Sequence, residues 1–200
     1  SIFDEEGHQV PVTVLECGPC MVLQHKTLPR DGYEAVQLAF EDQKEQRMNK
    51  PELGVFKKAG LPPKRIRFEM DLEAGESPKL GDLLTVSMFE KTGFVDVSAI
   101  SKGKGFQGVV HRYRMRGGPK THGGHSKRRI GSIGCRELPG RVHKNKRMPG
   151  QMGNTHITQQ NLQIVKVLPE DNVLLVRGAV PGSAGGIVLV RKSVKKGAKA

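Results

Sequence analysis

The feature that most constrains this chain is a block of positive charge between residues 101 and 154. The block holds 14 Lys and Arg against a single acidic residue, Glu137, and it also holds 12 of the 25 glycines. Such a segment buries too little apolar surface to offset the entropy lost on folding. Its cations repel one another unless a polyanion neutralises them. We therefore expect the segment to be either disordered or functional.

The flanking residues have the composition of a folded domain. Residues 1–100 carry 12 basic and 17 acidic side chains, and residues 155–200 carry 7 and 2. Short runs of alternating apolar and polar residues, separated by Gly, Pro and Asp, predict strands. These strands are expected at 10–16, 21–25, 33–40, 65–70, 83–89, 94–99, 162–168, 173–177 and 187–191. One short helix is expected at 51–59, because Pro51 suits its first turn and Gly60 its end.

Many short strands with little helix favour a mostly β fold built as a small barrel. We expect residues 1–100 and 155–192 to build this barrel together, with a small helical insertion at about 41–75. Residues 101–154 would then form a long irregular basic extension, and residues 193–200 a Lys-rich tail.

Composition excludes several classes of protein. No run of eighteen apolar residues is present to span a membrane, and three cysteines are too few for a disulfide scaffold. No positively charged and then apolar leader opens the chain. We therefore expect a protein of a reducing, cytosol-like compartment, with neither a membrane contact nor a small-molecule substrate.

Two cysteines raise the possibility of redox or metal chemistry. Cys17-Gly18-Pro19-Cys20 matches the active-site tetrapeptide of thioredoxins, in which a helix begins at the first Cys and lowers its pKa. Here the residues after Cys20 alternate like a strand, so we expect a plain turn, no redox work and thiols near the ordinary pKa of about 8.5. Zinc binding with His122 and His125 is the other possibility. About a hundred residues separate the two pairs, and we therefore expect no metal and no cofactor.

A glycine motif begins the basic segment. Residues 103–108 (GKGFQG) satisfy the dinucleotide-binding pattern, which needs an apolar helix next and an acidic residue about twenty positions later. Basic residues follow instead, and Arg128 and Arg129 stand where the acid would be. We interpret these glycines as positions where the backbone approaches phosphates closely.

The basic segment has the chemistry of an RNA-binding surface. Lys and Arg contact phosphate oxygens and release counterions, and Arg also stacks on bases. A Gly-rich chain can follow the irregular grooves of folded RNA, whereas duplex DNA favours a basic helix or ribbon on a compact domain. The residues expected to bind RNA are Lys102, Lys104, Arg112, Tyr113, Arg114, Arg116, Lys120, Lys127, Arg128, Arg129, Arg136, Arg141, Lys144, Lys146 and Arg147.

Specific blocks of sequence occur in order along nearly the whole chain. They include 18–20 (GPC), 31–37 (DGYEAVQ), 56–60 (FKKAG), 101–108 (SKGKGFQG), 150–153 (GQMG) and 174–182 (LLVRGAVPG). Together these blocks resemble the bacterial type of the large-subunit ribosomal protein L-three family.

The resemblance implies a translation-protein-type β-barrel, SH3-like or elongation-factor-like, on the solvent side of the large ribosomal subunit. It also implies a long loop running inward through 23S-type ribosomal RNA, with its tip, at about Asn145 to His156, near the peptidyl-transferase centre. The family is a non-enzymatic structural constituent that binds this RNA directly and early in assembly, beside neighbouring ribosomal proteins. The implied location is a ribosome in bacterial cytoplasm, and an organellar ribosome stays an alternative.

Two positions refine the resemblance. Gln151 lies in a block where bacterial members can carry a side-chain-methylated glutamine, which implies a glutamine methyltransferase as a partner. The alternative is an ordinary solvated loop glutamine. Tyr113-Arg114-Met115 replaces the Trp-Asn-Phe of the family, so that Tyr113 would take over the stacking contact.

Other classes of protein stay open on the residues alone. The first is a nucleoid or ribosome-assembly protein that coats nucleic acid without specificity. The second, a redox or zinc enzyme, ranks below it.

Overall fold

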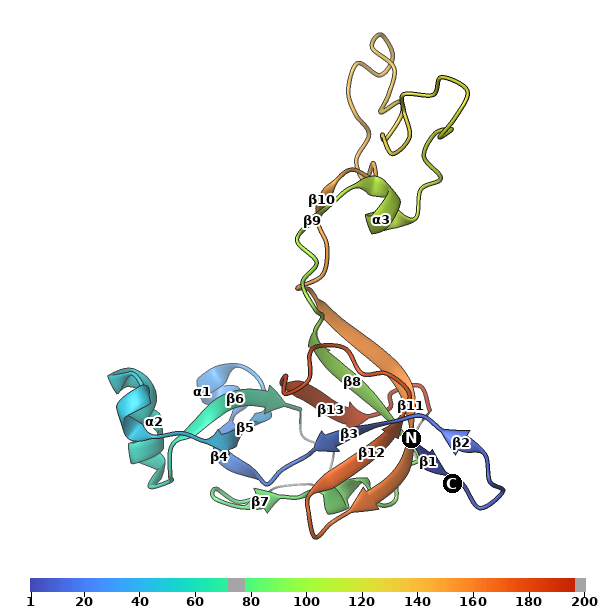
Figure 1. The fold of residues 1–200 in the computed structure, drawn as a ribbon. Coiled ribbons are helices and arrows are strands. Elements are labelled where there is room, and N and C mark those ends of the chain that lie inside the picture. Colours follow the sequence, from blue (N-terminus) through green and yellow to red (C-terminus); the bar gives the residue numbers. More distant parts are fainter. Residues whose placement is uncertain (72–77, 197–200) are drawn as a thin grey trace. The chain divides into compact units, whose positions relative to one another are not determined.

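A computed structural model describes residues 1–71 and 78–196, and its elements are labelled in Figure 1. The fold is mostly β, as predicted, with two main sheets, two short strand pairs and a few small helices. The ends of the predicted insertion at 72–75 and of the predicted tail at 197–200 lie outside the described residues. Within the described residues, no helix is long and apolar enough to cross a membrane.

The larger sheet brings together strands from both ends of the chain. Its members are β3 (Val12–Glu16), β8 (Phe94–Ile100), β11 (His156–Leu168), β12 (Val173–Arg177) and β13 (Val188–Lys192). Their order across the sheet is β13, β8, β11, β12, β3, and β3 pairs antiparallel with β12. Alternation places Leu174 and Val176 in the core, where both are fully buried.

The second sheet is built from the first half of the chain. It contains β4 (Cys20–Lys26), β5 (Ala35–Asp42), β6 (Lys64–Met70) and β7 (Leu83–Leu84), in the order β6, β5, β4, β7. Because successive side chains point to opposite faces, Val22 and Leu23 belong to two different apolar clusters. Val22 packs with Val36 and Leu38, whereas Leu23 packs with Ala39 and with Phe56 of helix α2 (Lys50–Ala59).

Helix α2 matches its prediction closely. Pro51 lies in its first turn, and Gly60 ends it in the left-handed region at φ 67°, where its N–H bonds back to the helix. The predicted strand 83–89 is wrong beyond Leu84, because Val86–Phe89 forms a 3₁₀ turn, η2. Val86 and Phe89 are both buried and lie three residues apart, which is the period of that turn.

The smaller elements were not all predicted. Helices α1 (Leu28–Asp31) and α3 (Val109–Tyr113) and the turn η1 (Glu45–Arg47) are too short to leave a periodic pattern. The strand pairs are β1 with β2 (Ile2–Phe3 and Gln9–Val10) and β9 with β10 (Phe106–Gln107 and Gly150–Gln151).

The chain forms two compact units. Unit 1 consists of Ser1–Asp96, Gln160–Val180 and Val190–Ala200, and unit 2 consists of Val97–Gln159 and Pro181–Leu189. The whole basic segment, residues 101–154, therefore belongs to unit 2.

A buried carboxylate ties together three separated parts of unit 1. Asp96 is 1% exposed, and it accepts hydrogen bonds from the backbone N–H of Asn161 at 2.8 Å and of Val194 at 3.4 Å. Arg191 Nε lies 3.9 Å from the same carboxylate. The hydroxyl of buried Ser193 donates to Asn161 Oδ1 at 2.6 Å, which extends the network to the chain after β13.

Candidate nucleic-acid interface

All fifteen residues predicted to bind RNA lie in unit 2. Thirteen of them are exposed, and Arg112 and Tyr113 are half-buried. Their exposure follows from composition, since the segment offers few apolar side chains to cover the stems of its Lys and Arg residues.

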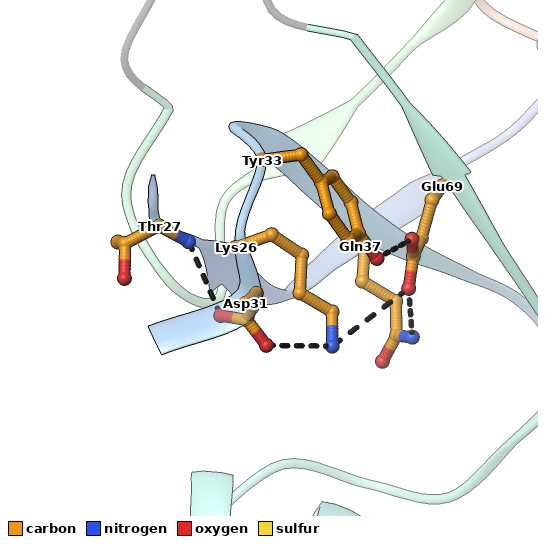
Figure 2. Close-up of polar contacts among 6 residues, drawn as sticks. All are labelled: Lys26, Thr27, Asp31, Tyr33, Gln37 and Glu69. Atoms are coloured by element: carbon orange, nitrogen blue, oxygen red, sulfur yellow. Dashed lines mark hydrogen bonds and ion pairs between the residues drawn. The ribbon is translucent and has the colours of Figure 1, made fainter. Parts of the chain in front are cut away.

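The cations of unit 1 contrast with those of the basic segment. Lys26 Nζ lies 3.4 Å from an Asp31 carboxylate oxygen and 3.9 Å from a Glu69 carboxylate oxygen, and Figure 2 shows Lys26 between the two. Tyr33 donates its hydroxyl proton to Glu69 at 2.7 Å, and Gln37 donates to the same carboxylate at 3.1 Å. The hydrogen bond from the Thr27 N–H lowers the pKa of the Asp31 carboxyl, and the Lys26 ammonium lowers it further. Charge in this part of unit 1 is therefore neutralised internally.

No such neutralisation occurs in residues 101–154. Within the described parts of the chain, none of the 14 Lys and Arg side chains of this segment forms an ion pair. The positive charge is thus left available to a polyanion from outside the protein.

One aromatic ring gathers two of the cations. The guanidinium carbons of Arg112 and Arg147 lie over the Tyr113 ring, 5.0 Å and 5.6 Å from its centre. Arg112 also donates from Nη1 to the Met148 carbonyl at 2.8 Å. Arg112 therefore holds the outgoing and returning chains of the segment together in addition to supplying charge.

The two chains also pair directly at β9 and β10, where Figure 1 shows them side by side. Next to that pair, the Lys104 N–H donates to the Met152 carbonyl at 2.8 Å and the Met152 N–H donates to the Gly105 carbonyl at 2.9 Å. Gly153, at φ 69°, lies so close that an added Cβ would fall on the Lys102 carbonyl oxygen. Close packing of backbone on backbone is thus one use of these glycines, and their predicted use toward phosphates stays a prediction.

Gly153→Ala is expected to weaken the two backbone hydrogen bonds that join Lys104 and Gly105 to Met152, since the new methyl group has no room against the Lys102 backbone. We expect amide hydrogen exchange at Lys104 and Met152 to accelerate by at least about tenfold, for a cost of roughly 2 kcal/mol. Gly105→Ala is the matched control, because Gly105 has a similar φ of 66° but open space around an added Cβ. Equal acceleration in both variants would show that backbone strain alone, without the steric overlap, explains the effect.

Gln151 lies in β10 directly opposite Phe106 and is exposed. Its side-chain Nε2 donates weakly to the neighbouring Met152 carbonyl at 3.4 Å. Of the range 145–156 implied as the tip of the loop, residues 150–151 are paired with β9, and His156 begins β11. Gln151 therefore lies where the ends of the 108–149 segment meet.

Phe106 is a candidate residue that the sequence reasoning missed. Its side chain is 77% exposed, although it belongs to a paired strand within the basic segment. Exposed aromatic rings among cations are stacking platforms for nucleobases. The available signal was that Phe106 and Tyr113 are the only aromatic residues in 101–154, in a stretch too polar to bury them.

The cysteines correct one prediction. Burial raises the pKa of the Cys17 thiol to about 12, with Cys20 and Glu16 adding to the shift, and burial also raises the pKa of the Cys20 thiol. The expectation of ordinary pKa values was therefore wrong, and the shift further disfavours the reactive thiolate.

Among the described residues, no group of three or more His, Cys, Asp and Glu is placed to hold a metal ion.

Cys135 is expected to be the thiol that alkylates first in the native protein. It is exposed, and the backbone N–H groups of Glu137, Leu138 and Arg136 lower its pKa, so it holds the largest thiolate fraction at neutral pH. Brief iodoacetamide treatment followed by peptide mass spectrometry should label Cys135 well before Cys17 and Cys20. Denaturation in urea should equalise the three. Native labelling of Cys17 as fast as Cys135 would contradict the burial argument.

Comparison with known proteins adds an independent finding. Residues 76–172 match the model of a family described as Ribosomal protein L3. The "Large ribosomal subunit protein uL3" of Brachyspira pilosicoli is 46% identical over 196 residues, which cover 98% of this chain and 90% of the relative. The protein of the same name from Brachyspira hyodysenteriae is 45% identical over the same coverage.

Proposed function

This chain belongs to the Ribosomal protein L3 family, whose role in the ribosome is structural and non-enzymatic, and on that premise we propose that it binds 23S-type ribosomal RNA directly through residues 101–154. The single observation that carries the proposal is the unneutralised charge of unit 2. Fourteen cations without an acidic partner among the described residues repel one another, and an external polyanion would offset that repulsion. Ribosomal RNA supplies that charge.

The finer details rest on the family and on the placement of residues. We propose that the protein joins the large subunit early in assembly, beside neighbouring ribosomal proteins, in the cytoplasm of a bacterium. The implied tip, at about Asn145 to His156, would approach the peptidyl-transferase centre. The Tyr113 cluster supports this role in another way: the Arg112 and Arg147 guanidinium groups already lie over the ring, so a base would stack on these guanidinium planes.

Sedimentation of the intact protein tests the proposal. Tagged protein in its own cell extract should migrate with large subunits through a high-salt gradient and should already be present in early precursor particles. Recovery mainly as free protein, or on DNA and RNA of every kind, would instead favour a nucleoid or assembly protein that coats nucleic acid without specificity. Salt matters in this test because non-specific electrostatic binding weakens most steeply as salt rises.

We further propose that Gln151 is the substrate of a glutamine methyltransferase. Its amide is exposed and makes only one weak hydrogen bond, so an enzyme can reach the nitrogen. Methylation removes one donor and keeps the other donor and the acceptor oxygen. Mass spectrometry of the native protein should show one methyl increment on the peptide containing Gln151.

Replacement of the same residue separates a special role from an ordinary one. Gln151→Ala should slow large-subunit assembly or peptide-bond formation while leaving the protein folded. Gln160→Ala is the matched control, because Gln160 is also exposed on a strand. An unmodified peptide together with normal assembly would reduce Gln151 to an ordinary solvated glutamine.

A further inference from the structure

A cavity of about 440 Å³ lies within unit 2, between the beginning of α3 and the chain that returns to β10. Val109, Ile130 and Pro149 provide an apolar part of its lining, and Ser126, Arg128 and Arg129 provide a polar part. Its volume falls within the range of about 300–1,000 Å³ that is usual for small-ligand sites. Three separated stretches of the basic segment therefore build one concave site.

The two parts of the lining suit different parts of one ligand. Val109 is 2% exposed and leaves little surface for a ligand, whereas Ile130 is half-buried and Pro149 is exposed, so these two side chains offer the accessible apolar surface. Arg128 and Arg129 are exposed, and neither forms an ion pair with any described residue. A flat apolar group beside an anionic group fits this division, because apolar surface gains by leaving water and guanidinium groups bind phosphate in a forked geometry.

We propose that this cavity binds a single unpaired nucleotide of RNA, with its base against Ile130 and Pro149 and its phosphate at Arg128 and Arg129. The inference rests on the proposed RNA-binding function and adds a defined subsite to it. Inorganic phosphate alone would leave the apolar wall in water. A continuous duplex would keep its bases stacked inside the helix, whereas unpaired nucleotides in RNA loops are free to leave the stack.

A substitution that fills the cavity without changing charge tests the site. Gly108 borders the cavity, has an ordinary φ of −71°, and has open space around an added Cβ. Gly108→Leu should therefore occupy the space reserved for the base. Gly54→Leu is the matched control, since Gly54 lies in α2 of unit 1 and also has open space around an added Cβ.

The probes are an RNA hairpin with an unpaired loop and a blunt RNA duplex of the same stem. The wild-type protein should bind the looped RNA at least about fivefold more tightly, which corresponds to one stacked base. Gly108→Leu should lose this preference and keep the duplex affinity and its salt dependence. Preserved preference in Gly108→Leu would overturn the subsite while leaving RNA binding intact. No RNA binding by the wild-type protein would overturn the proposed function as well.

Crosslinking of the wild-type protein provides a second measurement that no folding defect can affect. The looped hairpin is prepared with 4-thiouridine in its loop and irradiated in the complex. Crosslinked peptides should come from residues 126–131 and from the peptide containing Pro149. Crosslinks confined to other parts of the segment would contradict a site for the base.

Discussion

Replacing Arg136, Arg141 and Lys144 by alanine is expected to reduce the salt dependence of RNA binding by about one to three in the slope of log K against log salt, with the upper value reached when all three side chains meet phosphates. All three side chains are exposed and lack an acidic partner among the described residues. If about eight of the 14 cations meet phosphates, the wild-type slope should be roughly −6 to −7. Filter binding at four or more salt concentrations measures both slopes.

The matched control removes the same charge from unit 1. Lys57, Lys58 and Lys91 are exposed, and their replacement by alanine should change the slope by less than about one. Equal flattening by both triple variants would mean that net charge, and not residues 101–154, governs binding. A wild-type slope shallower than about −3 would show that this segment is not the main contact surface.

Asp96→Ala is expected to lower the free energy of unfolding by about 3 kcal/mol. The substitution removes a charged acceptor and leaves the backbone N–H groups of Asn161 and Val194 without their partner in a buried site. Arg191 also loses its nearest carboxylate. Urea unfolding followed by circular dichroism should show an earlier midpoint with an unchanged slope.

Two further substitutions interpret that result. Asp96→Asn retains the size of the side chain and one acceptor oxygen. Its free energy of unfolding should therefore lie between those of the wild-type protein and Asp96→Ala. Asp82→Ala is the exposed control, because Asp82 accepts a backbone hydrogen bond from Lys79 at 2.7 Å at the surface, where water can replace it. A loss for Asp96→Ala no larger than that of Asp82→Ala would mean that the buried network contributes little to stability.

Local patterns predicted the elements that have clear boundary signals and enough apolar residues to be buried. The apolar runs of β4 and β5, which are buried on both faces, and the Pro51 and Gly60 signals of α2 were sufficient without knowledge of the fold. Asp96 was not predictable in this way. It interrupts an apolar run as an outward-facing residue would, and the groups that satisfy it come from Asn161, Arg191 and Val194, far away in the sequence.

Composition predicted where the candidate interface lies, but it did not predict the contacts that each residue of the interface makes. Charge alone made Arg112 one of many equivalent cations, whereas its bond to Met148 and its position over Tyr113 give it a structural part. For the same reason, an alanine variant of Arg112 would lose a positive charge and also the contacts with Met148 and Tyr113, so the two effects could not be separated. The Cys17 pKa likewise depends on burial by the folded chain, which no local pattern records.

The pairing of β3 with β12 has a consequence for the order in which the protein matures during synthesis. All strands of the β6-β5-β4-β7 sheet have been made once Leu84 is incorporated. In the larger sheet, as the described residues show it, β3 is an edge strand whose one neighbour is β12. It therefore cannot pair until Val173–Arg177 has left the ribosome that synthesises the chain. The basic segment, residues 101–154, is synthesised before β11, β12 and β13. The nascent chain therefore presents its cations before the larger sheet is complete.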